Sequence, residues 1–250
     1  MTVLLRILCW NIAEGMFGLD PVAEHIRQKA PDIVLLNEVR WRRWPFGKDQ
    51  THELSVKTGL PYYSFGRTVA TGLSGYKGVA VLSKYHLGPS RMHAVVRGQR
   101  KTAFATLATS VMINGVRHEI LSTRFAPHNT ADHAMENRMG VVQAAELART
   151  FNPSHPLIFG GDFNARLHTD QMKLFLSTCG LTEAQRECPD PSPGPCWDPE
   201  DRIDFILYRG EYKVRQMEFR CPEPQGSDHP SVFVVLESTR EPAQAQRQVS

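Results

Sequence analysis

The sequence predicts an α/β protein in which two β-sheets pack together and helices cover their outer faces. The chain holds many short apolar runs separated by polar connections, and only a few stretches between them have helical periodicity. The dipeptide Asn114-Gly115 lies between two such runs and is a strong signal for a β-hairpin. Many strands and hairpins with few helices favour layered sheets with helices outside. No linker divides the chain, so we expect one domain over residues 1–237.

The apolar runs that we expect to form strands extend along the whole chain. In order they are residues 4–10, 32–39, 77–83, 102–113, 118–125, 157–159, 202–208 and 231–237. None of them reaches the roughly 18 apolar residues that a membrane-spanning helix needs, so we expect no membrane span. Residues 238–250 are polar, and we expect them to form a disordered tail.

Helices are expected in three of the connections. Asp20 and Pro21 suit the N-cap and the first position of a helix that Pro31 ends. A longer helix is expected at about residues 132–150 and a short one near 169–178. The apolar face predicted for the longer helix consists of Met135, Met139, Val142 and Ala145.

The composition is that of an ordinary globular protein, with 41% hydrophobic and 22% charged residues and a net charge of +3. This mild positive charge is compatible with an anionic substrate but is too small for a protein that coats nucleic acid. The five cysteines include no C-x-x-C pair, which favours a reduced, cytoplasmic protein without a disulfide framework. Cys188 and Cys196 flank a proline-rich loop, where free thiols are a simpler expectation than a disulfide or a shared metal. We also expect a monomer.

Several predicted strands lead directly into carboxylate, carboxamide or imidazole side chains. These motifs are Trp10-Asn11, Asn37-Glu38, Asp162-Phe163-Asn164, Arg202-Ile203-Asp204 and Ser227-Asp228-His229. Taken singly, most have an ordinary explanation: Glu38 can leave its strand into water, and Asp162 can cap a turn. Asp204 is harder to explain, because a charge inside an apolar strand is costly without a partner. Together the motifs are rich in the hard oxygen ligands that suit Mg²⁺ or Mn²⁺ rather than zinc.

As an ordered set, these motifs resemble the endonuclease/exonuclease/phosphatase superfamily, which has the DNase I-like fold. The matching segments are LCWNI, DIVLLNEV, GVAVLSK, ILSTRFAPHN, LIFGGDFNA, RIDFIL and GSDHPSV, and they cover about residues 4–236. The resemblance implies a four-layer α/β sandwich of two packed mixed β-sheets flanked by helices. It also implies a phosphoric ester hydrolase that uses Mg²⁺ or Mn²⁺. Glu38 would be the principal metal ligand, Asn11 would help it, and Asp228 would assist directly or through water.

The resemblance also implies which residues would act on the phosphate. Asp162 would orient or deprotonate the attacking water, and Asn164 would hydrogen-bond the phosphoryl oxygens. His229 would contact the scissile phosphate, and Asp204 would hold His229 in the required tautomer and charge state. A metal, a protonated histidine and an amide can stabilise the charge that develops in in-line attack. The two glycines before Asp162 would allow a tight turn, and Asp162 and Asn164 would share a face, as strand residues two apart do.

Arg124 departs from the family pattern. Members usually carry a histidine, or in abasic-site enzymes a tyrosine, in the segment that reads ILSTRFAP here. Arginine stays protonated and cannot act as an acid or base, but it can clamp a phosphate with two hydrogen bonds. We favour Arg124 as a phosphate clamp. The alternatives are that His128 takes the place of the missing histidine, or that the site is weakened.

The segment VRWRRWPFGK, which follows Glu38, interleaves basic and aromatic residues, and this combination suits the backbone and bases of a nucleic acid. Its candidate substrate-binding residues are Arg40, Trp41, Arg42, Arg43 and Trp44, together with Arg124. The plain alternative is a solvated loop whose tryptophans pack on the body of the protein. We expect a nuclease or other phosphodiesterase that acts on nucleic acid. The alternatives are a phosphomonoesterase for a small metabolite or lipid headgroup, and a weakly active or non-catalytic member that only binds phosphate.

Overall fold

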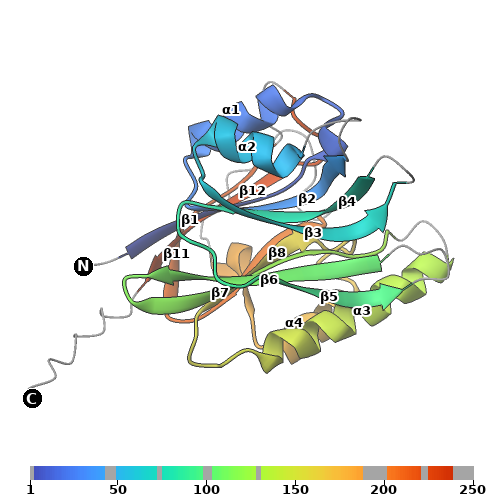
Figure 1. The fold of residues 1–250 in the computed structure, drawn as a ribbon. Helices are drawn as coiled ribbons and strands as arrows, with labels where there is room; N and C mark the ends of the chain where they lie inside the picture. Colours follow the sequence, from blue (N-terminus) through green and yellow to red (C-terminus); the bar gives the residue numbers. More distant parts are fainter. Residues whose placement is uncertain are drawn as a thin grey trace, which may run out of the picture.

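The computed structural model describes residues 3–42, 49–71, 75–97, 103–127, 131–187, 202–220 and 225–238. Their strands form two six-stranded sheets. Helices α1 and α2 lie on the outer face of one sheet, and α3 and α4 lie on the outer face of the other (Figure 1). The predicted four-layer α/β sandwich is therefore confirmed.

The first sheet has the strand order β11-β12-β1-β2-β4-β3. Within it only the central pair β1/β2 is parallel. The bounds of its strands are β1 Val3–Asn11, β2 Ile33–Arg42, β3 Tyr62–Ala70, β4 Gly75–Ser83, β11 Tyr212–Arg220 and β12 Ser231–Ser238.

The second sheet has the order β5-β6-β7-β8-β10-β9, and again only a central pair, β7/β8, is parallel. Its strands are β5 Arg91–Arg97, β6 Ala103–Ile113, β7 Val116–Arg124, β8 Leu157–Asp162, β9 Thr182–Glu183 and β10 Asp204–Arg209. The predicted hairpin is the β6/β7 pair. Asn114 and Gly115 at its turn have φ of 50° and 77°, as a two-residue hairpin turn of this type requires.

The helices and short 3-10 helices are α1 Leu19–Lys29, α2 Gln50–Thr58, α3 Ala131–Thr150, α4 Asp170–Cys179, η1 Ala13–Gly15 and η3 Ala184–Glu187. Helix α1 begins earlier than expected: Gly18 is its N-cap, and Asp20 lies in its first turn. The apolar face predicted for α3 was partly wrong, because Met135 and Met139 are exposed. The buried face is instead built from small residues, Val141, Ala144, Ala145 and Ala148, which let the helix approach the sheet closely.

The core has three apolar clusters, one between the sheets and one under each pair of helices. Leu5, Ile7 and Cys9 of β1 meet Ile120 of β7 and Ile158 of β8 in the central cluster. Cys179, the last residue of α4, is buried in the cluster under α3 and α4, and both it and Cys9 are free thiols, as expected. The three other cysteines lie outside the described residues.

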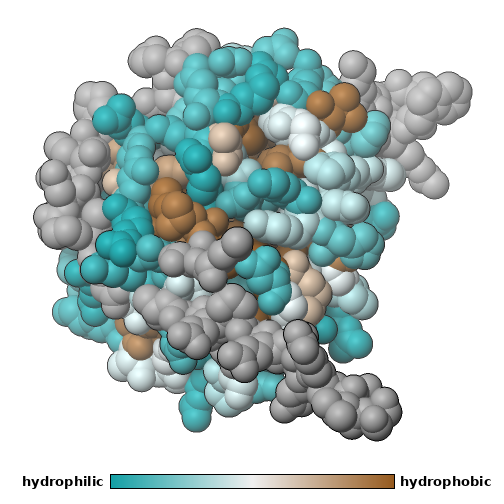
Figure 2. All heavy atoms as spheres, turned by 90° about the vertical axis from the view of Figure 1, so that its left-hand side faces the viewer, coloured by the Kyte–Doolittle hydropathy of each residue, from teal (hydrophilic) through white to brown (hydrophobic). Residues whose placement is uncertain are grey.

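Among the described residues, no helix is both long enough and apolar enough to cross a membrane. The face in Figure 2 is mostly hydrophilic, and its apolar side chains form small separate groups. Ser238, the first residue of the predicted disordered tail, instead ends β12, and the rest of that tail, from residue 239 on, falls outside the described residues.

Candidate active site

The two parallel strand pairs bring the predicted polar residues together at one edge of the sandwich. Asn11 and Asn37 are paired in register at the β1/β2 end, and Arg124, Asp162 and Asp204 are paired across β7, β8 and β10. Hydrogen bonds join the sheets here. Asn11 Nδ2 donates to Asp162 Oδ2 (3.0 Å), Asn37 Nδ2 donates to the Thr123 carbonyl (2.7 Å), and the Asp162 N–H donates to Asn37 Oδ1 (3.0 Å).

A bulge in β2 makes the side chains of Asn37 and Glu38 point in different directions. The β2/β4 register shifts between Leu36 and Val39, and Glu38 has a positive φ of 54°. A bulge adds a residue and breaks the strict alternation of side chains. Asn37 therefore reaches the second sheet while Glu38 reaches the edge of the sandwich. The expectation that the strand ends near Glu38 was wrong, since β2 continues to Arg42.

The two glycines before Asp162 serve close packing and not the tight turn that we expected. Gly160 and Gly161 lie inside β8. A Cβ on Gly161 would lie 1.9 Å from the carbonyl oxygen of Thr123, and one on Gly160 would lie 2.7 Å from Leu35 Cδ1. Gly161 also has a φ of 151°. The absence of side chains lets β8 approach both β7 and the other sheet just before Asp162.

Asn164 meets Asp162 by a route other than strand alternation. The strand ends at Asp162, and Asn164 adopts a left-handed φ of 46°, which asparagine tolerates better than most residues. Its side-chain Nδ2 donates to Asp162 Oδ2 (3.0 Å) and to the Phe125 carbonyl (2.9 Å), and its N–H donates to Asp162 Oδ1 (2.9 Å). The side-chain amide of Asn164 thus holds the Asp162 carboxylate, and both of its described donor contacts are made within the protein.

Asp162 is a buried carboxylate, about 1% exposed. Burial and the neighbouring charge of Asp204 raise its pKa to about 6, while the positive charges of His229 and Arg124 oppose this rise. Arg124 Nε lies 3.8 Å from Asp162 Oδ2. The Asp162 carboxylate is therefore held in place, with a pKa raised to about 6.

Asp204 and His229 form a hydrogen-bonded pair. His229 Nδ1 lies 2.8 Å from Asp204 Oδ2, and Asp204 is about 1% exposed. Burial alone would lower the pKa of His229, but the Asp204 carboxylate, with Asp162 and Asp228, raises it to about 10. Trp10 Nε1 donates to the His229 carbonyl (2.9 Å) and fixes its backbone. The imidazole is thus positively charged at neutral pH, with Nε2 only 3.4 Å from Asn11 Nδ2.

Glu38 is held between two cations. Arg124 Nη2 donates to Glu38 Oε1 (2.5 Å), and Lys77 Nζ donates to Glu38 Oε2 (3.2 Å). Asn11 Nδ2 also lies 3.3 Å from Oε1. Burial raises the pKa of Glu38, but the charges of Arg124 and Lys77 lower it by a larger amount, so the net shift is downward. The carboxylate is therefore ionised at neutral pH.

The donors near Glu38 are compatible with a hydrated Mg²⁺ or Mn²⁺. Among the described residues, no group of three or more His, Cys, Asp and Glu side chains is arranged to hold a metal ion. Mg²⁺, however, is often held by one or two carboxylates and keeps several waters. Glu38 offers such a carboxylate. Its ion pairs with Lys77 and Arg124 show that positive groups are stabilised beside its two oxygens. Its neighbour Asn11 has a carboxamide oxygen that accepts from the Ala13 N–H (3.0 Å).

The described contact of Asp228 lies within its own turn, and its assistance to a metal stays a prediction. Asp228 is exposed, and its Oδ1 lies 3.3 Å from Ser227 Oγ. Ser227 Oγ also donates to the Asn11 carbonyl (2.6 Å) and accepts from the His229 N–H (3.1 Å). This turn fixes His229 against β1, and Asp228 contributes to the site through its charge near the imidazole.

Part of the predicted substrate-binding segment is engaged within the protein. Arg40 Nε is paired with Glu14. Trp41 packs on Tyr76 with ring centroids 5.8 Å apart, and the guanidinium of Arg67 lies 5.5 Å from the Trp41 ring and 4.5 Å from the Tyr76 ring. The Arg42 side chain, Arg43, Trp44 and the alternative residue His128 all lie outside the described part of the structure.

Residues that the sequence argument did not assign complete the site. Lys77 joins Glu38 to Glu14, whose Oε1 lies 3.1 Å from Lys77 Nζ. Asn37 connects the two sheets and positions the Asp162 backbone. Asn37 stands directly before Glu38, and its amide was a visible signal. Lys77 begins the apolar run KGVAVLS and gave no such signal.

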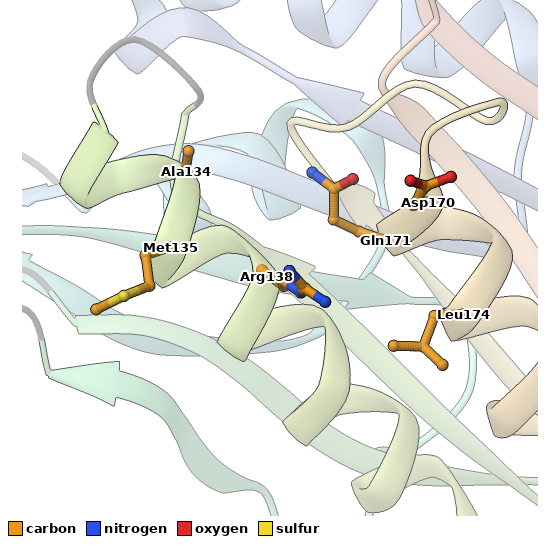
Figure 3. Close-up of a pocket in the computed structure, with 6 residues that line it drawn as sticks. All are labelled: Ala134, Met135, Arg138, Asp170, Gln171 and Leu174. Atoms are coloured by element: carbon orange, nitrogen blue, oxygen red, sulfur yellow. The ribbon is translucent and has the colours of Figure 1, made fainter.

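A separate pocket lies between α3 and α4, with a volume of about 390 Å³. Figure 3 shows its lining residues, which are Ala134, Met135 and Arg138 from α3 and Asp170, Gln171 and Leu174 from α4. None of these residues belongs to the polar cluster at the strand ends. The chemistry described above therefore resides at the strand ends and not in this pocket.

Comparison with known proteins agrees with this geometry. The sequence pattern of the Endonuclease/Exonuclease/phosphatase family matches residues 8–229. A solved endonuclease/exonuclease/phosphatase from Beutenbergia cavernae DSM 12333 is 21% identical, with a TM-score of 0.80 over 94% of this chain and 72% of that one. A family protein from Leptotrichia buccalis C-1013-b is 19% identical, with a TM-score of 0.73 over 93% of this chain and 99% of that one.

A humanized D. rerio TDP2 also has the same fold, at 16% identity and a TM-score of 0.69, over 93% of this chain and 98% of that one. No curated protein matched the chain. The family pattern covers most of the chain, and the fold is the one that the pattern implies. The chain therefore belongs to the Endonuclease/Exonuclease/phosphatase family, whose members are generally phosphoesterases.

Proposed function

We propose that the protein hydrolyses phosphodiester bonds of nucleic acid and requires Mg²⁺ or Mn²⁺. One observation carries the proposal: the Asn11 amide lies within 3.4 Å of Asp162, Glu38 and His229 at once. The proposed base Asp162, the proposed metal ligand Glu38 and the positively charged imidazole of His229 thus lie around one amide group. These are the groups that attack on a phosphate requires.

Asp162 is the residue that takes a proton from the attacking water. Its Oδ2 is held by the side-chain amides of Asn11 and Asn164, so its orientation is fixed before substrate arrives. With a pKa raised to about 6 by burial and by Asp204, it is mostly ionised at neutral pH and is still basic enough to accept a proton.

His229 and Arg124 stabilise the negative charge that grows on the phosphoryl oxygens. The pKa of His229 is lowered by burial but raised overall, to about 10, by Asp204 and the other carboxylates, so its ring carries a proton throughout the neutral range. Arg124 is always charged and offers several donors. Such preorganised charges are among the largest contributions to catalysis in buried sites.

Glu38 and Asn11 are the residues that would hold the divalent cation. The ion, when bound, supplies Lewis-acid stabilisation of charge on the phosphate oxygens. The Asn11 amide contacts both the ionised Glu38 carboxylate and Asp162, so the carboxylate that would hold the ion lies beside the proposed base.

Nucleic acid as the substrate class is supported by the surface next to Glu38. Trp41, three residues after Glu38, packs with Tyr76 and the exposed Arg67. Aromatic rings next to an arginine suit the bases and backbone of a single strand. The distinct alternative, a phosphomonoesterase, would use the same catalytic residues without this surface.

The decisive test is an assay with Mg²⁺, Mn²⁺ or EDTA on a panel of substrates. The panel holds single- and double-stranded DNA, abasic DNA, RNA, bis-p-nitrophenyl phosphate and p-nitrophenyl phosphate. We expect metal-dependent cleavage of a nucleic acid and of the diester, lowered about 10²- to 10⁴-fold in Asp162→Asn. Cleavage of the monoester alone would instead support the phosphomonoesterase. A folded protein that binds metal and cleaves none of these substrates would contradict the proposal.

A further inference from the structure

Lys77 and Arg124 occupy both oxygens of a single carboxylate. Arg124 Nη2 lies 2.5 Å from Glu38 Oε1, and Lys77 Nζ lies 3.2 Å from Glu38 Oε2. Their side chains are only 18% and 13% exposed, respectively, and Glu38 is 16% exposed. These are thus partly shielded charges at the rim of the site, where ion pairs are stronger than on an open surface.

Both cations keep hydrogen-bonding capacity that Glu38 does not use. Arg124 Nε is buried and has no hydrogen-bond partner among the described residues, although it faces Asp162 Oδ2 at 3.8 Å. Lys77 has three donor hydrogens, and its described partners are Glu38 and Glu14. These spare donors can serve an acceptor outside the described residues, such as a bound anion.

The charges around Lys77 balance while Glu38 is ionised. Arg124, Lys77 and Arg40 form a chain of ion pairs with Glu38, Glu14 and Asp162, so three cations face three carboxylates. If another cation neutralises Glu38, one positive charge is left over, and a phosphodiester carries one negative charge.

We propose that Lys77 is a phosphate-binding residue and that its ion pair with Glu38, like that of Arg124, keeps it from phosphate until Glu38 is neutralised. A divalent cation at Glu38 competes with both side chains for the two carboxylate oxygens, and releases them to bind the phosphate of the substrate. Metal binding and anion binding are then positively coupled, and the coupling is reciprocal. The substrate class rests on the proposed function, but the competition for Glu38 does not.

The competition can be tested without metal and without turnover. Inorganic phosphate is titrated in EDTA and followed by ³¹P NMR with the wild type, Glu38→Gln and the double variant Glu38→Gln/Lys77→Met. Removing the Glu38 charge frees both cations, so Glu38→Gln is expected to bind phosphate about tenfold more tightly than the wild type. The double variant is expected to lose most of this gain. Glu218→Gln is the matched control, because Glu218 pairs with Lys29 away from the site, and it is expected to change nothing.

A second measurement uses variants that keep Glu38, so it does not depend on whether Glu38→Gln folds. Mn²⁺ binding is measured by electron paramagnetic resonance for the wild type, Lys77→Met and the control Lys29→Met. Only Lys77→Met is expected to bind Mn²⁺ several-fold more tightly. Two results would overturn the inference: no gain in phosphate affinity in folded Glu38→Gln, or a gain that persists without Lys77. Failure of the proposed function would be seen in a different measurement. It would appear as a lack of hydrolysis, whereas the coupling is measured by phosphate and Mn²⁺ binding.

Discussion

Asp162 and Asp204 lie directly opposite each other in the antiparallel β8/β10 pairing, and each is about 1% exposed. Each of two neighbouring buried carboxylates opposes the ionisation of the other. The structure resolves the conflict by pairing Asp204 with His229 and leaving Asp162 with a raised pKa. One carboxylate thus keeps an imidazole protonated while the other becomes a base suited to neutral pH.

This division of roles predicts the pH dependence of hydrolysis. Burial and the charge of Asp204 raise the pKa of Asp162 to about 6, so kcat/KM is expected to rise as the pH passes through that value. Activity is expected to fall again near the pKa of about 10 to which the carboxylates raise His229, against the opposing effect of burial. A pH profile of kcat/KM at saturating metal measures both limits. A flat profile between pH 5 and 8 would contradict the role of Asp162.

Asp204→Asn should lower the pKa of His229. Without its hydrogen-bonded anionic partner, burial is opposed only by Asp162 and Asp228, and the imidazole pKa is expected to fall well below about 10. NMR titration of the His229 ring measures this directly, and turnover at pH 8 is expected to fall about 10²- to 10⁴-fold. Glu119→Gln is the control, since it removes the carboxylate beside His155 Nδ1 (3.0 Å) in another part of the molecule. An unchanged His229 titration would refute the pairing.

The same pair also affects stability in a defined pH window. His229 has a folded-state pKa of about 10, above its ordinary value of 6.5, because the Asp204 carboxylate outweighs burial. Its contribution is therefore fully present below about pH 6.5 and is lost as the pH rises towards 10. The free energy of unfolding of the wild type, relative to His229→Gln, should decrease across this window in urea titrations. A difference that stays constant from pH 6 to 10 would show that the proton contributes nothing.

The fold class and the strand-end residues could be predicted because both depend on local patterns. Asp162, Asp204 and His229 follow or lie within apolar runs, and adjacent strand ends bring such residues together. Lys77 could not be found in this way, because its contact with Glu38 depends on the pairing of β2 with β4 and on the bulge at Glu38. Sequence alone does not specify a bulge of this kind.

The elements that the sequence argument missed are mainly at the sheet edges. Strands β3, β5 and β11 carry many exposed or polar residues, so they lack the apolar runs that marked the central strands. Helix α2 is short and weakly amphipathic, and its start depends on Asp49, whose side chain accepts from the Thr51 and His52 N–H groups. Partner strands and caps stabilise these elements, and neither is visible as periodicity.

Arg124→Ala separates catalysis from metal binding. Arg124 contacts Glu38 and faces Asp162, so its loss removes a positive charge from the proposed phosphate position and from the proposed metal ligand Glu38. We expect kcat/KM to fall about 10²-fold or more, as for other preorganised charges. Mn²⁺ affinity should stay the same or increase, because a competing cation is gone. Parallel kinetics and calorimetry measure both quantities, and a variant as fast as the parent would mean that Arg124 is not a clamp.

Gly161→Ala should damage the site through the backbone. The added Cβ would lie 1.9 Å from the Thr123 carbonyl oxygen, at a φ of 151° that side chains rarely adopt, so β8 must move away from β7. A clash with backbone in a buried strand is expected to cost about 3 kcal/mol or more of unfolding free energy. Gly59→Ala is the control: its φ is 72°, nothing lies within 4 Å of its Cβ, and its cost should be about 1 kcal/mol. Urea midpoints compare the two variants. Equal losses would show that the left-handed backbone, and not the close approach of β8 to β7, sets the requirement for glycine next to Asp162.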